Sequence, residues 1–277
     1  MNPPSVFPST SLPPLLDAVA WWSALATLGV ALLLGALLLP RLPGWRRGEA
    51  WLLRAVAGLV PLGLVVLLAG QDDGLVLWLP WGWIGLVGWL ACVASLIRSR
   101  RQREEKTDES NRFSGGILAW TGWAAVTLWL AVMLAPALCP SIDYDVLEYH
   151  LAIVRRVFVT GRVAPIPHVF YTAQPLLTEM LYTLAAAIEG TPWGVAPGLL
   201  LWLLVALGTL VFARLAATLR LPTPWRPWLW LLLLSHPILF KLQLDRLTDW
   251  TGVLMLLAGL WVAARTQSEA TRTPLVL

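Results

Sequence analysis

Residues 116–150, GILAWTGWAAVTLWLAVMLAPALCPSIDYDVLEYH, decide both the fold class and where chemistry is expected. The stretch from Gly116 to Leu138 has no charged side chain and is long enough, as a helix, to cross a hydrocarbon core roughly 30 Å thick. The segment 141–150 follows directly and carries three carboxylates, two phenols and an imidazole. Ionisable groups beside a membrane are costly to place, so this acidic segment is a candidate functional site.

The same apolar pattern recurs along the chain, which is 58% hydrophobic and only 13% charged, with a mean hydropathy of +0.70. Lipid offers no hydrogen-bonding partner to the backbone, so each run is expected to be a helix. We predict an all-α, polytopic membrane protein with about seven transmembrane helices. The seven runs are 18–40, 51–70, 75–97, 116–138, 194–217, 226–242 and 249–265.

Two segments fit this scheme less simply. The run 226–242 is interrupted by Pro227 and Pro237, which makes it the least secure span. The apolar stretch 176–188 is too short to cross and contains Glu179, so we expect an interfacial or re-entrant helix there.

The distribution of positive charge predicts the orientation. One alternating set of loops, 41–54, 98–112, 214–226 and 265–277, holds 15 of the 20 Lys and Arg residues, and the other set holds 5. Positive loops remain cytoplasmic, so the N-terminus is expected outside and the C-terminus inside, in a plasma or inner membrane. We interpret the basic runs as topology signals and anionic-lipid contacts, and expect no nucleic-acid partner.

The chain is expected to divide at a hydrophilic segment. Residues 1–97 would form an N-terminal three-helix membrane unit with a short external tail. Residues 98–113 would form a basic cytoplasmic linker, and residues 114–277 a membrane core that includes the long extracytoplasmic loop 139–193.

A helical wheel separates residues 145–159 into two sides. This predicts an amphipathic juxtamembrane helix in the first large extracytoplasmic loop, which Gly161 would end. The apolar side consists of Val146, Leu147, Leu151, Ile153, Val154, Val157 and Phe158, and the polar side of Asp145, Glu148, Tyr149, Arg155 and Arg156.

The polar side allows two interpretations. In the functional one, Asp145 is a general base or a charge-stabilising acid, and Arg155 or Arg156 binds phosphate. In the structural one, the acids and arginines of an interfacial helix only pair and face water. The oxygens of Asp143, Asp145 and Glu148 are also of the kind that holds Mg²⁺ or Mn²⁺, although no ligand spacing requires a metal.

Other polar residues have similarly open roles. His150 falls on the apolar side, which favours a buried, hydrogen-bonded structural histidine over a catalytic base. His168 could line a site or pack within its loop, and Glu179 requires either a substrate or a structural hydrogen-bond partner. Asp245, Arg246 and Asp249 can be explained by an ion pair and a helix N-cap at Thr248 or Asp249, or by a role in acceptor binding. His236, before Pro237, is expected to cap or satisfy a kink.

Several of these elements resemble the first extracytoplasmic loop of GT-C fold glycosyltransferases. They are Asp145-Val-Leu-Glu-Tyr-His-Leu151, then Gly161, Pro167-His168, and Gln174-Pro175 with Glu179. The resemblance covers about residues 116–265. It is strongest to the branch of dolichyl-phosphate-mannose protein mannosyltransferases and lipid A aminoarabinose transferases.

The resemblance implies transfer of a sugar, with inversion, from a polyprenyl-phosphate donor to a lipid, glycan or protein acceptor at the extracytoplasmic face. It implies that Asp145 is the base on the acceptor hydroxyl, supported by Asp143 and Glu148. Asp249 matches a second acidic position of the family. Tyr149, His168 and Glu179 are candidate substrate-binding residues, and Arg155 and Arg156 are our own candidates for the donor phosphate.

Family members usually have more helices, so we expect this chain to be an N-terminal fragment of such an enzyme. The alternative is a non-catalytic membrane subunit or scaffold that keeps the fold. A transporter is less favoured, because the acids lie at the interface and no repeated halves are evident.

Overall fold

The computed structural model describes residues 18–42, 44–70, 79–104, 116–139, 147, 150–164, 176–192, 194–244 and 249–270. The described part of the chain is all-α, as predicted. Its helices are α1 (Ala18–Leu38), α2 (Arg47–Ala69), α3 (Leu79–Glu104), α4 (Gly116–Leu138), α5 (Leu151–Thr160), α6 (Leu177–Glu189), α7 (Ala196–Thr218), a short 3₁₀ helix η5 (Thr223–Trp225), α8 (Arg226–Leu234), α9 (Pro237–Leu244) and α10 (Trp250–Ala270).

Four of these helices, α1, α2, α4 and α7, are long and apolar enough to cross a membrane. The chain is therefore an integral membrane protein by the length and composition of its helices. In α3, the residues whose side chains the structure describes form a shorter apolar helix, from Gly82 to Ile97. The count of seven spans stays a prediction.

The predicted sixth span is divided into two short helices. Helix α8 ends at Leu234, and α9 begins at Pro237. A proline disfavours helical backbone at the residue before it and has no N–H to donate, which accounts for the break. The carbonyl of His236 accepts a hydrogen bond from the backbone N–H of Phe240 (2.8 Å), so His236 caps α9 as expected.

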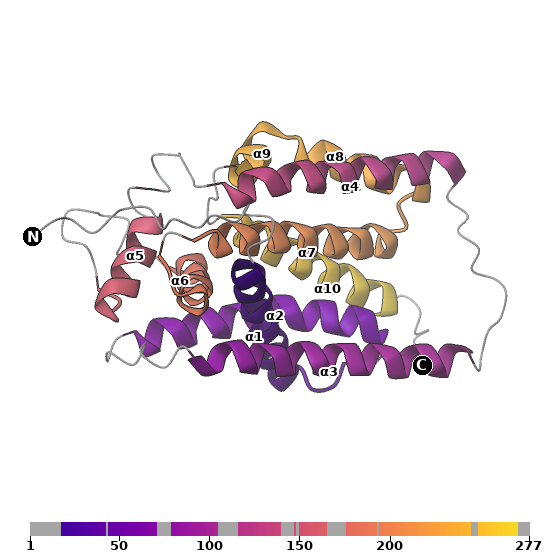
Figure 1. The fold of residues 1–277 in the computed structure, drawn as a ribbon. Helices are drawn as coiled ribbons and strands as arrows, with labels where there is room; N and C mark the ends of the chain where they lie inside the picture. The colour runs from indigo at the N-terminus through magenta and orange to yellow at the C-terminus, as the bar shows by residue number, and fades with distance from the viewer. Residues whose placement is uncertain are drawn as a thin grey trace, which may run out of the picture.

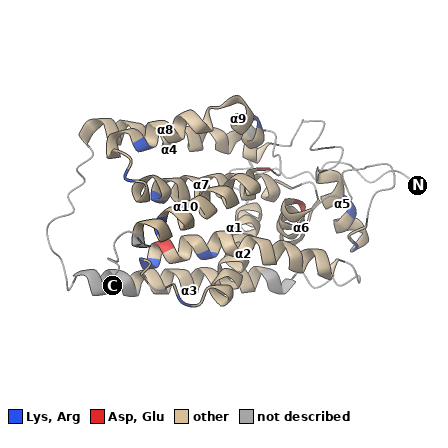
Figure 2. Ribbon diagram, turned by 180° about the vertical axis from the view of Figure 1, so that it is seen from behind, with Lys and Arg blue, Asp and Glu red and all other residues tan. Residues whose placement is uncertain are grey.

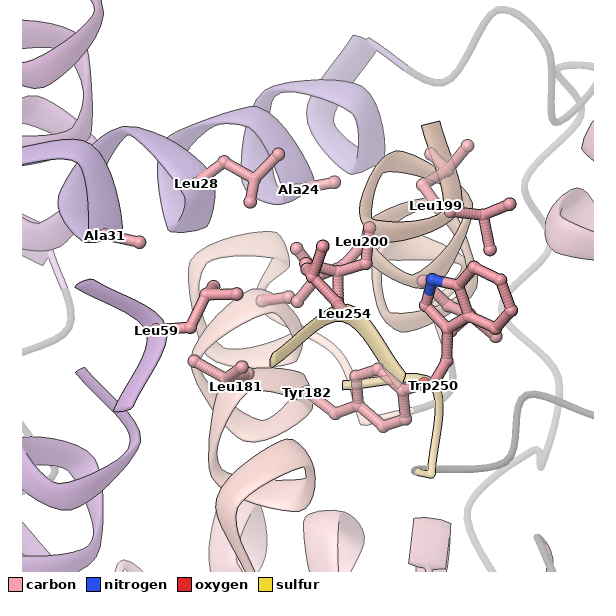
Figure 3. Close-up of a cluster of buried hydrophobic side chains, with 14 of the residues drawn as sticks. Ala24, Leu28, Ala31, Leu59, Leu181, Tyr182, Leu199, Leu200, Trp250 and Leu254 are labelled. Carbon is pink, nitrogen blue, oxygen red and sulfur yellow. The ribbon is translucent and has the colours of Figure 1, made fainter. Parts of the chain in front are cut away.

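One buried cluster joins the two halves of the sequence. It contains side chains from α1, α2, α6, α7 and α10, among them Ala24, Leu59, Tyr182, Leu200 and Leu254 (Figure 3). Helix α6 lies inside this cluster, since every residue from Thr178 to Ala186 is buried. The short apolar stretch is thus a helix, as predicted, and other helices enclose it.

Helices α5 and α6 lie together at one end of the long helices (Figure 1). The backbone N–H of Val163, just after α5, donates to the carbonyl of Gly70, just after α2 (2.8 Å). This hydrogen bond fixes the end of α5 against the end of a membrane helix. The described charged residues gather mostly toward the two ends of the long helices (Figure 2).

The apolar side predicted for α5 is confirmed within its described residues. Leu151, Ile153, Val154 and Val157 are buried. Gly161 follows the helix with φ of 69°, in the left-handed region that glycine tolerates, and its N–H donates to the carbonyl of Val157 (2.8 Å). Gly161 therefore ends the helix, as predicted.

Candidate functional site

The structure describes four of the candidate site residues: Arg155, Arg156, Glu179 and Asp249. The other candidates lie outside the described residues. These are Asp143, Asp145, Glu148, Tyr149 and His168, together with Asp245 and Arg246 of the second acidic cluster.

Glu179 and His150 are the central contact of the described site. His150 directly precedes α5, and Glu179 is in the first turn of α6. The His150 Nδ1 and the Glu179 Oε1 are 2.7 Å apart, and their side chains are 13% and 6% exposed. Buried polar groups need hydrogen-bond partners, so this contact gives both residues the partner that the sequence required. His150 is hydrogen-bonded, as the structural interpretation expected.

A second buried hydrogen bond connects α6 to α10. The hydroxyl of Thr178 donates to the hydroxyl of Thr251 (2.9 Å). Thr178 precedes Glu179, and Thr251 follows Asp249 by two positions, so the starts of the two helices lie together. The side chain of Asp249 is exposed. Its carbonyl accepts a hydrogen bond from the N–H of Val253 (3.1 Å), which makes Asp249 the N-cap of α10.

The two arginines of α5 differ in their burial. Arg156 is exposed and Arg155 is partly buried. Burial lowers the pKa of the Arg155 guanidinium from its usual value. Arginine remains charged despite this shift. An anion next to the Arg155 guanidinium would therefore replace part of the interaction with water that burial removes.

The start of α7 is at the same end of the molecule as α5 and α6 (Figure 1). The Glu189 carboxylate, at the end of α6, accepts hydrogen bonds from the backbone N–H groups of Val195 and Ala196 (3.1 and 3.2 Å). This end therefore collects the N-termini of α6, α7 and α10. The N-terminal end of a helix carries partial positive charge, which favours anions nearby.

Metal binding is not tested by this arrangement. Among the described residues, no three His, Cys, Asp or Glu side chains are grouped so that they could hold an ion. The predicted oxygen ligands Asp143, Asp145 and Glu148 fall outside those residues. Mg²⁺ or Mn²⁺ therefore stays a sequence-based prediction.

The sequence did not identify the partners in either buried contact. It required a partner for Glu179 but placed His150 only on an apolar side, and it gave no sign of the pair Thr178 and Thr251. The segments involved are 29 and 73 residues apart in the chain. Neither helical periodicity nor a local motif reports contacts across such distances.

Comparison with known proteins found no match among protein-family models, curated proteins or solved structures.

Proposed function

We propose that this protein is a membrane glycosyltransferase of the GT-C type. It transfers a sugar from a polyprenyl-phosphate donor to an acceptor at the extracytoplasmic face of the membrane. The seven membrane spans, the external acidic loop and the role of Asp145 as the base are predictions from the sequence.

The contact between His150 and Glu179 carries the proposal. The resemblance to GT-C enzymes rests on two separate pieces of sequence, Asp145 to Leu151 and Gln174 to Glu179. His150, the next-to-last residue of the first piece, and Glu179, the last residue of the second, meet through a part-buried 2.7 Å contact. A single motif requires that its pieces lie together, and this contact brings the two pieces together.

The position of this unit also suits a lipid-linked donor. A polyprenyl-phosphate sugar keeps its phosphate at the level of the lipid headgroups, beside the ends of the membrane helices. Helix α5 follows the acidic segment at this level and has Arg155 and Arg156 on its polar side. Guanidinium groups stabilise a phosphate that gains charge as it leaves.

The reaction can be written with these residues. The Asp145 carboxylate accepts the proton of the acceptor hydroxyl, whose oxygen forms a bond to the anomeric carbon of the donor. The bond between that carbon and the phosphate oxygen breaks, and its electron pair leaves with polyprenyl phosphate. A single displacement of this kind inverts the anomeric configuration.

The choice of donor tests the proposal. The full chain, reconstituted in vesicles with membrane-derived acceptors, is incubated with polyprenyl-phosphate mannose, polyprenyl-phosphate aminoarabinose, or the nucleotide-linked form of each sugar. We expect release of polyprenyl phosphate and labelling of an acceptor from a lipid-linked donor only. Transfer from nucleotide sugars, or no transfer from any donor, would contradict the proposal, and the second result would favour a non-catalytic subunit.

A further inference from the structure

A cationic cavity lies at the opposite end of the molecule from α5 and α6. It has a volume of about 370 Å³ and is found where α2 begins and where α7 and α10 end. In Figure 2, this end shows an acidic segment (red) among basic segments (blue) beside α10. Its lining residues are Arg46, Glu49, Arg214, Ala217, Thr218, Arg220, Arg265 and Ser268.

Among the described residues that line the cavity, the positive charge exceeds what one carboxylate can balance. The Glu49 Oε2 is 2.8 Å from the Nη1 of Arg265, and its Oε1 is 4.0 Å from the Nη1 of Arg214. Glu49 thus holds guanidinium groups of two different helices beside one another. Among the lining residues, four arginines and one glutamate leave a formal charge of +3.

Arg220 lines this cavity and has an unfavourable backbone conformation. Its φ is 57°, and it is the one non-glycine residue in the described chain with a positive φ. It directly follows Leu219, the C-cap of α7, and here the N–H of Leu221 donates to the carbonyl of Ala216 and that of Arg220 to the carbonyl of Ala217. Glycine is the usual residue at this position, and it is the residue found after α5 and α6. A residue kept in a strained conformation suggests a function for its side chain.

The cavity also lies at the depth of lipid headgroups. Both α2 and α7 are candidate membrane spans of 23 residues, and the cavity is formed at the first turn of α2 and the last turn of α7. The end of a membrane span is the level at which lipid phosphates are found. Arg and Lys at this level attract anionic lipids.

We propose that this cavity is a specific site for the phosphate headgroup of an anionic membrane lipid. Arg214 and Arg220 bind the phosphate oxygens through charge-assisted hydrogen bonds. The ion pair between Glu49 and Arg265 joins α2 to α10 beside them. The site is separate from the sugar-transfer site and does not depend on it.

The test measures lipid binding to the purified full chain in uncharged detergent by native mass spectrometry. The probes are phosphatidylglycerol, phosphatidylcholine and inorganic phosphate. We expect phosphatidylglycerol to bind preferentially, and Arg214→Gln and Arg220→Gly each to weaken its binding by about tenfold, as the loss of one charge-assisted bond implies. Arg41→Gln is the matched control, since Arg41 is an exposed arginine of the nearby α1–α2 connection that does not line the cavity.

The variants separate binding from folding. Arg220→Gly removes the charge but relieves the backbone strain, so its melting temperature should not fall. Equal losses in all three variants would indicate general surface charge and overturn the site. Equal binding of phosphatidylcholine would overturn the preference for an anionic lipid, and inorganic phosphate binding as tightly as phosphatidylglycerol would overturn the assignment to a lipid.

Discussion

Glu179 is a carboxylate within a run of nine buried residues, from Thr178 to Ala186. Burying an acid without a partner would cost several kcal/mol, by the usual order of magnitude for a charged group. The imidazole of His150 supplies that partner, and the hydrogen bond from the hydroxyl of Thr178 to Thr251 satisfies the neighbouring side chain. These two contacts hold the start of α6 to the start of α5 and to α10.

Replacing Glu179 by alanine should therefore destabilise the protein. We expect a loss of about 1–3 kcal/mol in the free energy of unfolding, because the imidazole of His150 would lose its 2.7 Å contact with the carboxylate. Glu179→Gln is the matched control. An amide can form a hydrogen bond with Nδ1 of His150 whether that nitrogen is protonated or not, so this variant should lose less stability. The measurement is reversible unfolding in detergent, followed by tryptophan fluorescence. Equal losses in the two variants would show that the hydrogen bond is not what stabilises α6.

Arg156 should contribute to donor binding if α5 faces the donor phosphate. Arg156→Gln is expected to raise the KM for the polyprenyl-phosphate sugar by about tenfold with little change in kcat, because a phosphate contact kept throughout the reaction contributes uniform binding. Arg162→Gln is the control, an exposed arginine beyond the end of α5. An unchanged KM for Arg156→Gln would remove this arginine from the donor site.

For single residues, the sequence could predict which side chains needed hydrogen-bond partners but not which partners they had. The charge of Glu179 in an apolar stretch, and the position of His150 on an apolar side, each indicated a buried polar group. That the two groups satisfy each other depends on how α5 packs on α6. Tertiary packing of this kind leaves no periodic signal in the chain.

Helix α1 packs closely against α2 and α3. A Cβ at Gly58 of α2 would collide with the backbone of Ala31, and one at Gly85 of α3 with the backbone of Ala26. Small residues at these points let the helix backbones approach closely. In a membrane this gain in van der Waals contact is a main force that holds helices together.

A methyl group added at Gly58 should push α2 away from α1. We expect Gly58→Ala to destabilise the protein by about 1–3 kcal/mol, the usual cost of overpacking a close contact. Gly259→Ala in α10 is the control, since a Cβ there meets nothing within 4 Å. That variant should be neutral or gain about 0.4–1 kcal/mol. Unfolding in detergent measures both, and a neutral Gly58→Ala would contradict close packing at this point.

The positions of the helices could largely be predicted from apolar runs, while their division and burial could not. The bounds of α4 coincide with the predicted run 116–138. The break between α8 and α9 was only indicated, by Pro227 and Pro237, because a proline can kink a helix or end it. The burial of α6 on every side depends on the surrounding α1, α2, α5 and α7. Composition alone does not reveal such neighbours.

For the whole molecule, four helices are long and apolar enough to cross a membrane, and most described charged residues lie toward the two ends of the helices (Figure 2). The acidic segment follows α4 at one end, and the arginine cavity lies at the other. The excess of positive charge in one set of loops predicts that the arginine end is cytoplasmic. This orientation has a direct chemical test.

Cys139 reports the orientation, because it is exposed directly after α4 whereas Cys92 is buried in α3. We expect a membrane-impermeant maleimide to label the protein in right-side-out vesicles and not in inside-out vesicles. Cys139→Ser should abolish the labelling, which controls for reaction at Cys92. Labelling from the cytoplasmic side alone would reverse the predicted topology and place the acidic segment away from the lipid-linked donor.

We propose that Asp145 accepts the proton of the acceptor hydroxyl during sugar transfer. The most direct measurement is the release of polyprenyl phosphate from the lipid-linked donor by the reconstituted chain, compared between wild type, Asp145→Asn and Asp143→Asn. We predict that Asp145→Asn lowers the rate by about 10²–10⁴-fold, the usual contribution of a general base, and that Asp143→Asn lowers it less. Release at the wild-type rate by an Asp145→Asn protein that inserts normally in the membrane would contradict the account.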